Sequence, residues 1–388
     1  MTAIPISNFS ERADSLVETL RRYIALESPS TDKAAVYKLG LVIANELRSL
    51  GATVEIDKQT TTGDHVIGRF GSGADGRKGI VIMSHLDTVH DVGAIRANPV
   101  RAENGKLFGP GAIDMKGSLV LVLAALRALI ENGKMPARPV TALFTSDEEI
   151  GSNSSRTLIE KLGAQAGLVL CMEPALPDGS LKTWRKGIGG YRIAVRGRST
   201  HAGADHENGV NAVEEMAHQV LALQRLTDYT RGTTVNVGVV RGGTRANVVP
   251  DECAIEVDLR AMTPADAEAA CRTIECLQPV NVKATLAITG GMNRPPMPRT
   301  ETIAAAFATA QRIAASLGLT IGEGGTGGGS DANFVAPLGV PVLDGLGPLG
   351  NGAHSEREHV LIKSLPERTA LLAAKTSPPD APMWTICP

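Results

Sequence analysis

Three apolar segments in the first half of the chain each lead directly into acidic or histidine residues. They are GIVIMSHLD (79–87), VTALFTSDEE (140–149) and AGLVLCMEP (166–174). Continuous apolar runs of this length are typical of strands buried on both faces, as in parallel sheets. Because open α/β sheets bind ligands at the carboxyl ends of their strands, we expect the polar residues that end these runs to meet at one edge.

Helical patterns alternate with these strands. Apolar residues recur at helical spacing in 10–27 and 32–50, and a further helix follows Asp114 and closes at Gly133. TVEID (53–57) and HVIGRF (65–70) predict two shorter strands. This alternation predicts an α/β fold with a mostly parallel mixed sheet and helices on both of its faces.

The pattern changes near Gly187. Residues 187–298 alternate in the order β-α-β-β-α-β, which is typical of a ferredoxin-like sandwich. A helix over 301–317 and the segment GVPVLDGLG then resume the first pattern. We therefore predict a catalytic domain in two parts, 1–186 and 299–388, interrupted by an inserted domain at 187–298. The chain of 388 residues is long enough for both, and it ends in a loose tail from about residue 376.

Composition excludes several classes of partner. A net charge of -2 and an aromatic content of 3% favour neither nucleic acid nor an anionic membrane. The longest apolar stretch, 119–130, is too short to span a bilayer and contains Arg127. The N-terminus lacks a signal-peptide pattern, and the five cysteines form no CxxC pair. These features predict a cytoplasmic protein.

Five scattered residues have the chemistry to hold two metal ions. They are His85, Asp114, Glu149, Glu173 and His354. Mixed imidazole and carboxylate ligands suit zinc, cobalt or manganese, whereas calcium and magnesium would not recruit two histidines. Beside one of them, Glu148 is free to act as a base that takes a proton from water.

Each candidate also has a simpler interpretation. His85 and Asp87 fit a buried histidine with a nearby acid, and Asp114 fits a helix N-cap about as well as a ligand. The acids 147–149 fit a solvated loop, although three adjacent acids can be buried only with cations nearby. Glu173 fits a strand that ends one residue earlier, and His354 an exposed loop histidine. The metal interpretation depends on all five coming together.

Seven motifs resemble those of the M20 metallopeptidases, and within them the glutamate carboxypeptidase (carboxypeptidase G2) type. They are HLDTV, GPGAIDMKG, TSDEEIGS, MEP, STHAG, TGGGSDANF and GNGAHSE, and they occur in the family's order. The resemblance as a whole runs from about residue 10 to 370 and includes the insertion. The resemblance implies two zinc ions per subunit, with Co²⁺ or Mn²⁺ as substitutes. One ion would be held by His85 and Glu173 and the other by Glu149 and His354, with Asp114 bridging them.

The resemblance also implies roles in catalysis. Glu148 would be the general base and later the acid, and Asp87 would orient His85. The inserted domain would be a lid that forms a homodimer, through which His201 would reach the partner's active site and stabilise the oxyanion. Taken alone, His201 fits a surface histidine at a turn.

The implied substrate is a small molecule or short peptide with a free carboxylate. Asn247 and Arg260 match positions that hold the α-carboxylate, for which the planar fork of arginine is suited, although Arg260 also fits a surface charge at a strand end. Gly328, Gly329 and Ser330 match a loop that lines the substrate pocket; TGGGS is not a phosphate loop, because it lacks GxxxxGK[ST].

The released amino acid depends on residues outside the metal set. Arg294 matches a position that binds the side-chain carboxylate of glutamate. A lysine is expected where this chain has Leu181, and Lys182 follows one step later. Release of glutamate is the first prediction, and an N-acyl-amino-acid deacylase of the acetylornithine or succinyl-diaminopimelate type is the alternative. A non-catalytic relative would have lost the base or a ligand, and all six residues are present.

Overall fold

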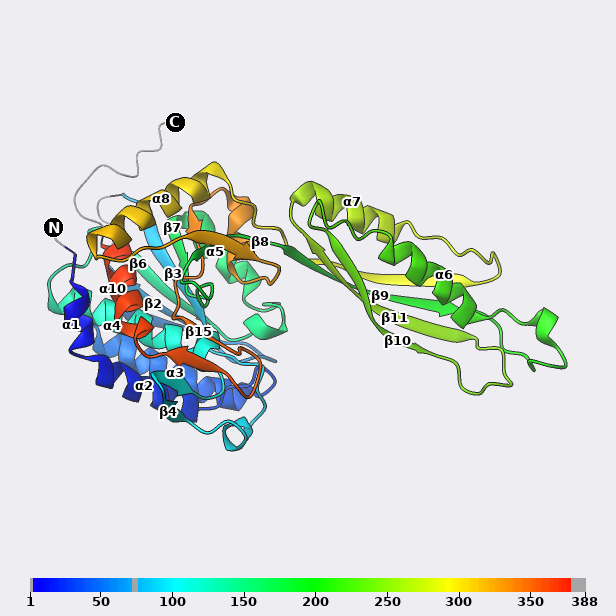
Figure 1. Cartoon of the computed structure of the whole chain (residues 1–388), viewed down its shortest axis with the longest axis horizontal. Coiled ribbons are helices and arrows are strands. Elements are labelled where there is room, and N and C mark those ends of the chain that lie inside the picture. Colours follow the sequence, from blue (N-terminus) through cyan, green and yellow to red (C-terminus); the bar gives the residue numbers. More distant parts are fainter. Residues whose placement is uncertain (1–2, 72–75, 378–388) are drawn as a thin grey trace. The chain divides into compact units, whose positions relative to one another are not determined.

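The computed structural model describes residues 3–71 and 76–377 (Figure 1). The chain divides into two compact units. The first comprises the described residues up to Thr183, then Arg299–Gly325 and those from Ser330 onward. The second comprises Trp184–Pro298 together with the short piece Thr326–Gly329.

A six-stranded mixed sheet lies at the centre of the first unit, in the order β1-β2-β6-β3-β7-β14. Its strands are β1 (Thr53–Asp57), β2 (His65–Phe70), β3 (Gly79–His85), β6 (Val140–Thr145), β7 (Ala166–Cys171) and β14 (Val342–Leu343). The last four are mutually parallel, whereas β2 runs antiparallel to β6, and β1 antiparallel to β2. The predicted mostly parallel mixed sheet is confirmed.

Helices cover both faces of this sheet (Figure 1). The connections β3-α4-β6 and β6-α5-β7 cross the sheet in opposite directions, so right-handed crossovers place α4 and α5 on opposite faces. The larger core contains Ile80 and Ile82 of β3, while the alternate residues Val81 and Met83 are buried on the other face. Burial on both faces explains why the sequence of β3 is a continuous run of apolar residues.

The helices of the first unit fall into two groups. The larger core includes residues of α2 (Ala13–Ala25), α3 (Lys33–Ser49), α4 (Gly117–Glu131), α8 (Glu301–Ser316) and α10 (Ser364–Thr376). The short α1 (Ile6–Ser10) packs on α10, whereas α5 (Arg156–Gln165) and α9 (Ala332–Val335) pack together beside β7.

Six short strands were not predicted. Four form a small sheet in the order β15-β16-β5-β4, and two form a ribbon. Their bounds are β4 (Arg101–Glu103), β5 (Lys106–Phe108), β15 (Gly350–Asn351), β16 (His359–Leu361), β8 (Leu181–Arg185) and β13 (Glu323–Thr326). Strands of two to five residues are too short for a clear alternation of apolar and polar residues. The small sheet matters because β5 precedes Asp114 and β16 follows His354.

The second unit has the predicted β-α-β-β-α-β order. It contains β9 (Gly187–Arg196), α6 (Ala212–Gln224), β10 (Thr234–Gly242), β11 (Glu252–Ala261), α7 (Pro264–Glu275) and β12 (Thr285–Arg294). Its antiparallel sheet has the order β10-β11-β9-β12, and it has its own core under α6 and α7. The backbones of Arg185 and Met297 exchange two hydrogen bonds of 2.9 and 3.0 Å, so the chain enters and leaves this unit side by side.

Two further predictions concern the ends and the thiols. Helix α10 extends to Thr376, and most of the predicted tail lies outside the described residues. Cys171 is buried and is not in a disulfide with another described cysteine. Across residues 3–71 and 76–377, none of the helices combines the length and the apolar character needed to cross a bilayer.

Candidate metal and active site

The structure brings all five predicted ligands together at the carboxyl edge of the central sheet. Asp114 lies in the middle, and each of its carboxylate oxygens faces one histidine. Its Oδ1 lies 3.2 Å from His85 Nε2, and its Oδ2 lies 3.3 Å from His354 Nε2. His85 Nε2 is also 3.6 Å from Glu173 Oε1, and His354 Nε2 is 3.2 Å from Glu149 Oε2. Two histidine–acid pairs therefore flank one shared carboxylate.

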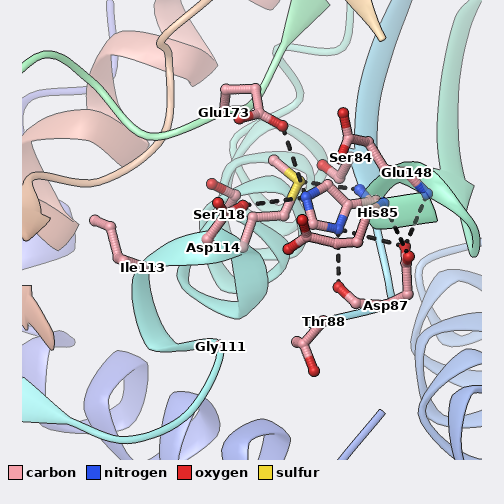
Figure 2. A network of polar contacts seen from close by, with 12 residues as sticks. Ser84, His85, Asp87, Thr88, Gly111, Ile113, Asp114, Ser118, Glu148 and Glu173 are labelled. Carbon is pink, nitrogen blue, oxygen red and sulfur yellow. Dashed lines mark hydrogen bonds and ion pairs between the residues drawn. The ribbon is translucent and has the colours of Figure 1, made fainter. Parts of the chain in front are cut away.

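Three of these side chains are placed by the ends of parallel strands, as predicted. His85 is the last residue of β3 and Glu173 follows β7 (Figure 2). Glu149 follows β6. His354 lies between β15 and β16 with a φ of 63°, a left-handed conformation that is uncommon outside glycine. Its imidazole is about half exposed, whereas His85 is buried.

The interpretation of Asp114 as a helix N-cap is wrong. It lies in an irregular turn, η2 (Ala112–Lys116), with extended backbone angles (φ −121°, ψ 93°), and α4 begins only at Gly117. No side chain caps that helix. The turn is tight enough to require glycine at Gly111, where φ is 71° and a Cβ atom would lie 2.6 Å from Thr88 Cγ2. The Asp114 carboxylate is thus directed to the histidines.

Asp87 contacts His85 and also the two glutamates that follow β6. His85 Nδ1 donates to the backbone carbonyl of Asp87 at 2.9 Å, and its distance to the Asp87 carboxylate is 3.5 Å. That carboxylate accepts hydrogen bonds from the backbone N–H groups of Glu148 (3.2 Å) and Glu149 (3.1 Å), and from the hydroxyl of Ser30 (2.6 Å). Asp87 therefore fixes the proposed base and one ligand as well as the histidine (Figure 2).

The ionisable side chains of this group shift one another's pKa values. Burial alone would lower the pKa of His85, but the adjacent carboxylates of Asp114 and Asp87 hold it well above its usual value. Hydrogen bonds with Asp114 and Glu149 raise the pKa of His354 to about 10. Burial raises the pKa of Glu149, whereas the two histidines overcome burial and lower that of Asp114. Both imidazoles thus respond to a surrounding excess of negative charge.

The residues fit a metal ion. Single ligand atoms of His85, Asp114 and Glu149 all lie within 4.8 Å of one another, a group of imidazole and carboxylate donors that could hold a metal ion. Glu149 Oε1 is buried and has no hydrogen-bond partner among the described residues. A buried carboxylate oxygen without a donor is costly, and a cation would satisfy it.

Other predicted site residues lie in the second unit. His201 Nδ1 accepts hydrogen bonds from the backbone N–H groups of Gly203 and Ala204, both at 3.1 Å. The exposed ring therefore carries its proton on Nε2 when neutral. Asn247 is exposed on the adjoining segment, where its carbonyl accepts from Ala202 N at 3.1 Å.

The predicted substrate arginines have partners of their own. Arg260 forms a fork with Asp258 through Nε and Nη2, both at 2.8 Å, and its Nη1 reaches Gly327 O at 3.3 Å. Arg294 is buried against Gly329, where an added Cβ atom would lie 2.7 Å from Arg294 Cδ.

The glycine loop is divided between the units. Gly328 and Gly329 belong to the second, and Ser330 to the first. Ser330 is fully buried, and its hydroxyl donates to Asp344 at 2.8 Å, so this side chain is not available to a substrate in this conformation.

Two buried residues, Arg185 and Glu358, were not predicted from the sequence. Arg185 donates from Nη1 to the carbonyls of Gly328 (3.1 Å) and Gly329 (2.8 Å), and so holds the glycine loop. Glu358 is fully buried and accepts from three backbone N–H groups of the turn that carries Asp114. Both bind backbone atoms, which leave no residue pattern in the sequence.

Comparisons with known proteins agree with this geometry. Residues 81–375 match the family described as Peptidase family M20/M25/M40. The chain is 32% identical to carboxypeptidase G2 of Pseudomonas sp. (strain RS-16) over 374 residues, which cover 94% of this chain and 89% of that protein. It is 29% identical to acetylornithine deacetylase of Erwinia tasmaniensis over 309 residues, or 73% of this chain and 78% of that one.

Solved structures share the fold. An aminopeptidase PepT from Bacillus cereus superposes with a TM-score of 0.78 at 23% identity, covering 94% of this chain and 98% of that one. An M20 family metallo-carboxypeptidase from Sulfolobus solfataricus gives 0.72 at 17% identity, covering 93% and 98%. The family match and the similarity to carboxypeptidase G2 establish that the chain belongs to the M20/M25/M40 peptidase family and is a hydrolase.

Proposed function

We propose that the protein is a di-zinc carboxypeptidase-like amidohydrolase that releases a C-terminal amino acid, glutamate, from peptidyl, N-acyl or folate-like substrates. One observation carries the reaction class: Asp114 presents one oxygen to each of two histidine–acid pairs. A carboxylate that lies between two histidine–acid pairs is suited to bind two cations that are a short distance apart.

His85, Glu173, Asp114, Glu149 and His354 would hold the two ions. Zinc is the ion we propose, and cobalt or manganese would suit the same donors. When bound, the ions would lower the pKa of water and polarise the amide carbonyl. Side chains of the protein would carry out the proton transfers and stabilise the oxyanion.

Glu148 is positioned to move the proton. Its backbone N–H is held by the Asp87 carboxylate at 3.2 Å, directly beside the candidate ligand Glu149. It takes a proton from the attacking water and delivers it to the leaving amine nitrogen. His201 offers an Nε2–H donor for the oxyanion, because its Nδ1 already accepts two hydrogen bonds.

Two buried arginines support glutamate as the released residue. Arg185 and Arg294 both contact the Gly328–Gly329 loop, so this part of the second unit is rich in positive charge. Against this, the position expected to hold a lysine is Leu181, which is packed in the core. Lys182 lies on the opposite side of the strand, buried beside Gly345. The deacylase alternative is favoured by that difference and by the similarity to acetylornithine deacetylases.

A substrate panel tests the choice. With zinc present, we expect turnover of an N-acyl-glutamate and an aroyl-glutamate, and little of acetylornithine or of neutral acyl amino acids. Arg294→Met should lower kcat/KM for glutamyl substrates by about 10- to 100-fold, the usual cost of a hydrogen bond to a charged group, and leave neutral substrates unchanged. Fast turnover of acetylornithine with none of the glutamyl amides would exclude our proposal in favour of the deacylase.

We also infer a cytoplasmic homodimer formed through the second unit, in which His201 serves the site of the partner subunit. This inference is supported by the exposure of His201 and by its free Nε2–H. Its test is a subunit-mixing experiment, given in the Discussion.

A further inference from the structure

Glu358 occupies an unusual position behind the candidate metal site. Its carboxylate is completely buried and accepts four hydrogen bonds. Oε1 accepts from the backbone N–H groups of Ile113 (2.9 Å) and Asp114 (3.0 Å), and Oε2 from that of Gly111 (2.9 Å) and from His90 Nε2 (2.6 Å). Four donors nearly fill the acceptor capacity of a carboxylate, so Glu358 is not itself a metal ligand.

These contacts join three segments that carry candidate ligands. The turn 109–116 carries Asp114 and supplies three of the donors. The segment that begins with His85 continues to His90, the fourth donor. Glu358 itself follows His354 by four residues and precedes β16, which pairs with β5 directly before the turn. The backbone carbonyl of Glu358 also accepts from Gly109 N at 3.2 Å.

The turn needs such an anchor because it is not helical. The backbone of Asp114 is extended, so its N–H has no helical partner, and the side chain is directed to the histidines. Without the carboxylate of Glu358, three buried N–H groups of the turn would lose their acceptor. The orientation of the shared carboxylate thus depends on an acid that does not touch it.

We propose that Glu358 is a positioning residue that sets the geometry of the Asp114 carboxylate between the two histidine–acid pairs, with His90 as its support. The inference rests on the proposed metal-dependent function. It predicts that changes at Glu358 alter metal binding itself, and not only the stability of the fold.

Glu358→Gln tests this with little change in shape. The amide nitrogen is a donor and would face N–H groups, so the turn must shift. We expect zinc affinity to fall by about 10- to 100-fold, the usual effect of losing a partner that orients a ligand. We also expect the visible absorption spectrum of the Co²⁺-loaded protein to change, and kcat to fall more than KM rises.

Glu27→Gln is the matched control. Glu27 likewise accepts from backbone N–H groups of one loop, at Gly93 (2.9 Å) and Ile95 (3.0 Å), but it holds no candidate ligand. It should lower the melting temperature while leaving zinc affinity and the Co²⁺ spectrum unchanged. If Glu358→Gln behaves in the same way as Glu27→Gln, the positioning role is overturned.

A second variant covers the case in which Glu358→Gln does not fold. His90→Ala removes one of the four donors from a position that is 15% exposed, and should shift affinity and spectrum in the same direction by less. Wild-type affinity and spectrum in His90→Ala, with Glu358→Gln unfolded, would refute the proposal. If wild-type protein binds neither zinc nor Co²⁺, the proposed function fails instead, so the two failures are distinguishable.

Discussion

Two adjacent glutamates of this site, Glu148 and Glu149, have different proposed roles. Glu149 and Glu148 are neighbours, and the backbone N–H groups of both are held by the same carboxylate, that of Asp87. Glu149 faces His354, and one of its oxygens is buried without a donor among the described residues. This arrangement supports the proposed division of roles, in which Glu149 holds a metal ion and Glu148 moves a proton.

Replacing Glu148 should therefore separate binding from chemistry. In Glu148→Ala we expect unchanged zinc content and a fall in kcat of about 10²- to 10⁴-fold, which is the typical contribution of a general base. Metal analysis and steady-state kinetics measure the two quantities. Glu149→Ala is the matched comparison, and it should lose metal as well as activity. Full activity in Glu148→Ala would show that the base has been wrongly assigned.

At the residue scale, the sequence predicted the residues whose side chains meet at the candidate site. Strand periodicity indicated that His85, Glu149 and Glu173 would meet, and the structure brings them together with Asp114 and His354. The sequence did not indicate Glu358 or Arg185, because the contacts that tie them to the turn and to the glycine loop are made to backbone atoms, which any residue type has. It also could not predict the fork between Arg260 and Asp258, which depends on side-chain rotamers.

At the scale of elements, long periodic segments were predicted well and short ones were missed. The apolar run GIVIMSH and the segment ECAIEVDLRA coincide with β3 and β11. The turn at Asp114 was predicted as a helix start, since a glycine-rich turn followed by an apolar helical pattern resembles a capped helix. Tertiary contacts of its backbone with Glu358, 244 residues away, hold it in another form.

A similar carboxylate anchors an element of the second unit. Glu215 on α6 is buried and accepts from Val280 N (3.0 Å), Asn281 N (2.8 Å) and Gln219 Nε2 (2.7 Å), which ties the helix to the loop before β12. Burial tends to raise its pKa, but these donors together lower it.

Glu215→Gln should destabilise this unit by about 1 to 3 kcal/mol at neutral pH, the cost of leaving buried donors unsatisfied. Because the folded pKa is lowered, the stabilisation is complete above the unfolded pKa of about 4.3 and is lost as the pH falls through the folded value. Hydrogen exchange of the second unit across a urea titration, at pH 7 and at pH 3, measures the difference.

The exposed neighbour provides the control for this experiment. Glu214→Gln changes the same charge without buried partners for its side chain, and should alter stability by less than about 0.5 kcal/mol. An equal effect of the two substitutions, or a difference that persists at pH 3, would contradict the anchoring role.

At the scale of the whole molecule, the proposed dimer makes a distinctive prediction. Glu148→Ala and His201→Ala should each be inactive alone. When the two chains are co-expressed, about a quarter of wild-type activity should return, since half of the dimers are mixed and each contains one complete site. Activity of the co-expressed mixture measures this, and the purified mixed dimer should have about half of wild-type activity.

The outcome depends on which chain supplies the histidine. If His201 served its own subunit, no mixed dimer would have a complete site and activity would not return. If the protein were monomeric, co-expression would likewise restore nothing, and light scattering would separate that case from the first. The family was predictable from motif order alone, whereas assembly depends on surfaces that no motif encodes.

The paired backbones of Arg185 and Met297 have a consequence for how such proteins diversify. The chain leaves the first unit and returns to it at neighbouring residues. Recombination at this one junction could therefore exchange the whole segment between Arg185 and Met297. Only the four residues Thr326–Gly329 must be matched in addition. All five candidate metal ligands and Glu148 lie in the first unit, outside the exchanged segment. Replacing this segment would keep the five candidate metal ligands and Glu148 but would remove Asn247, Arg260 and Arg294 as well as His201, so a replacement must bring its own oxyanion donor.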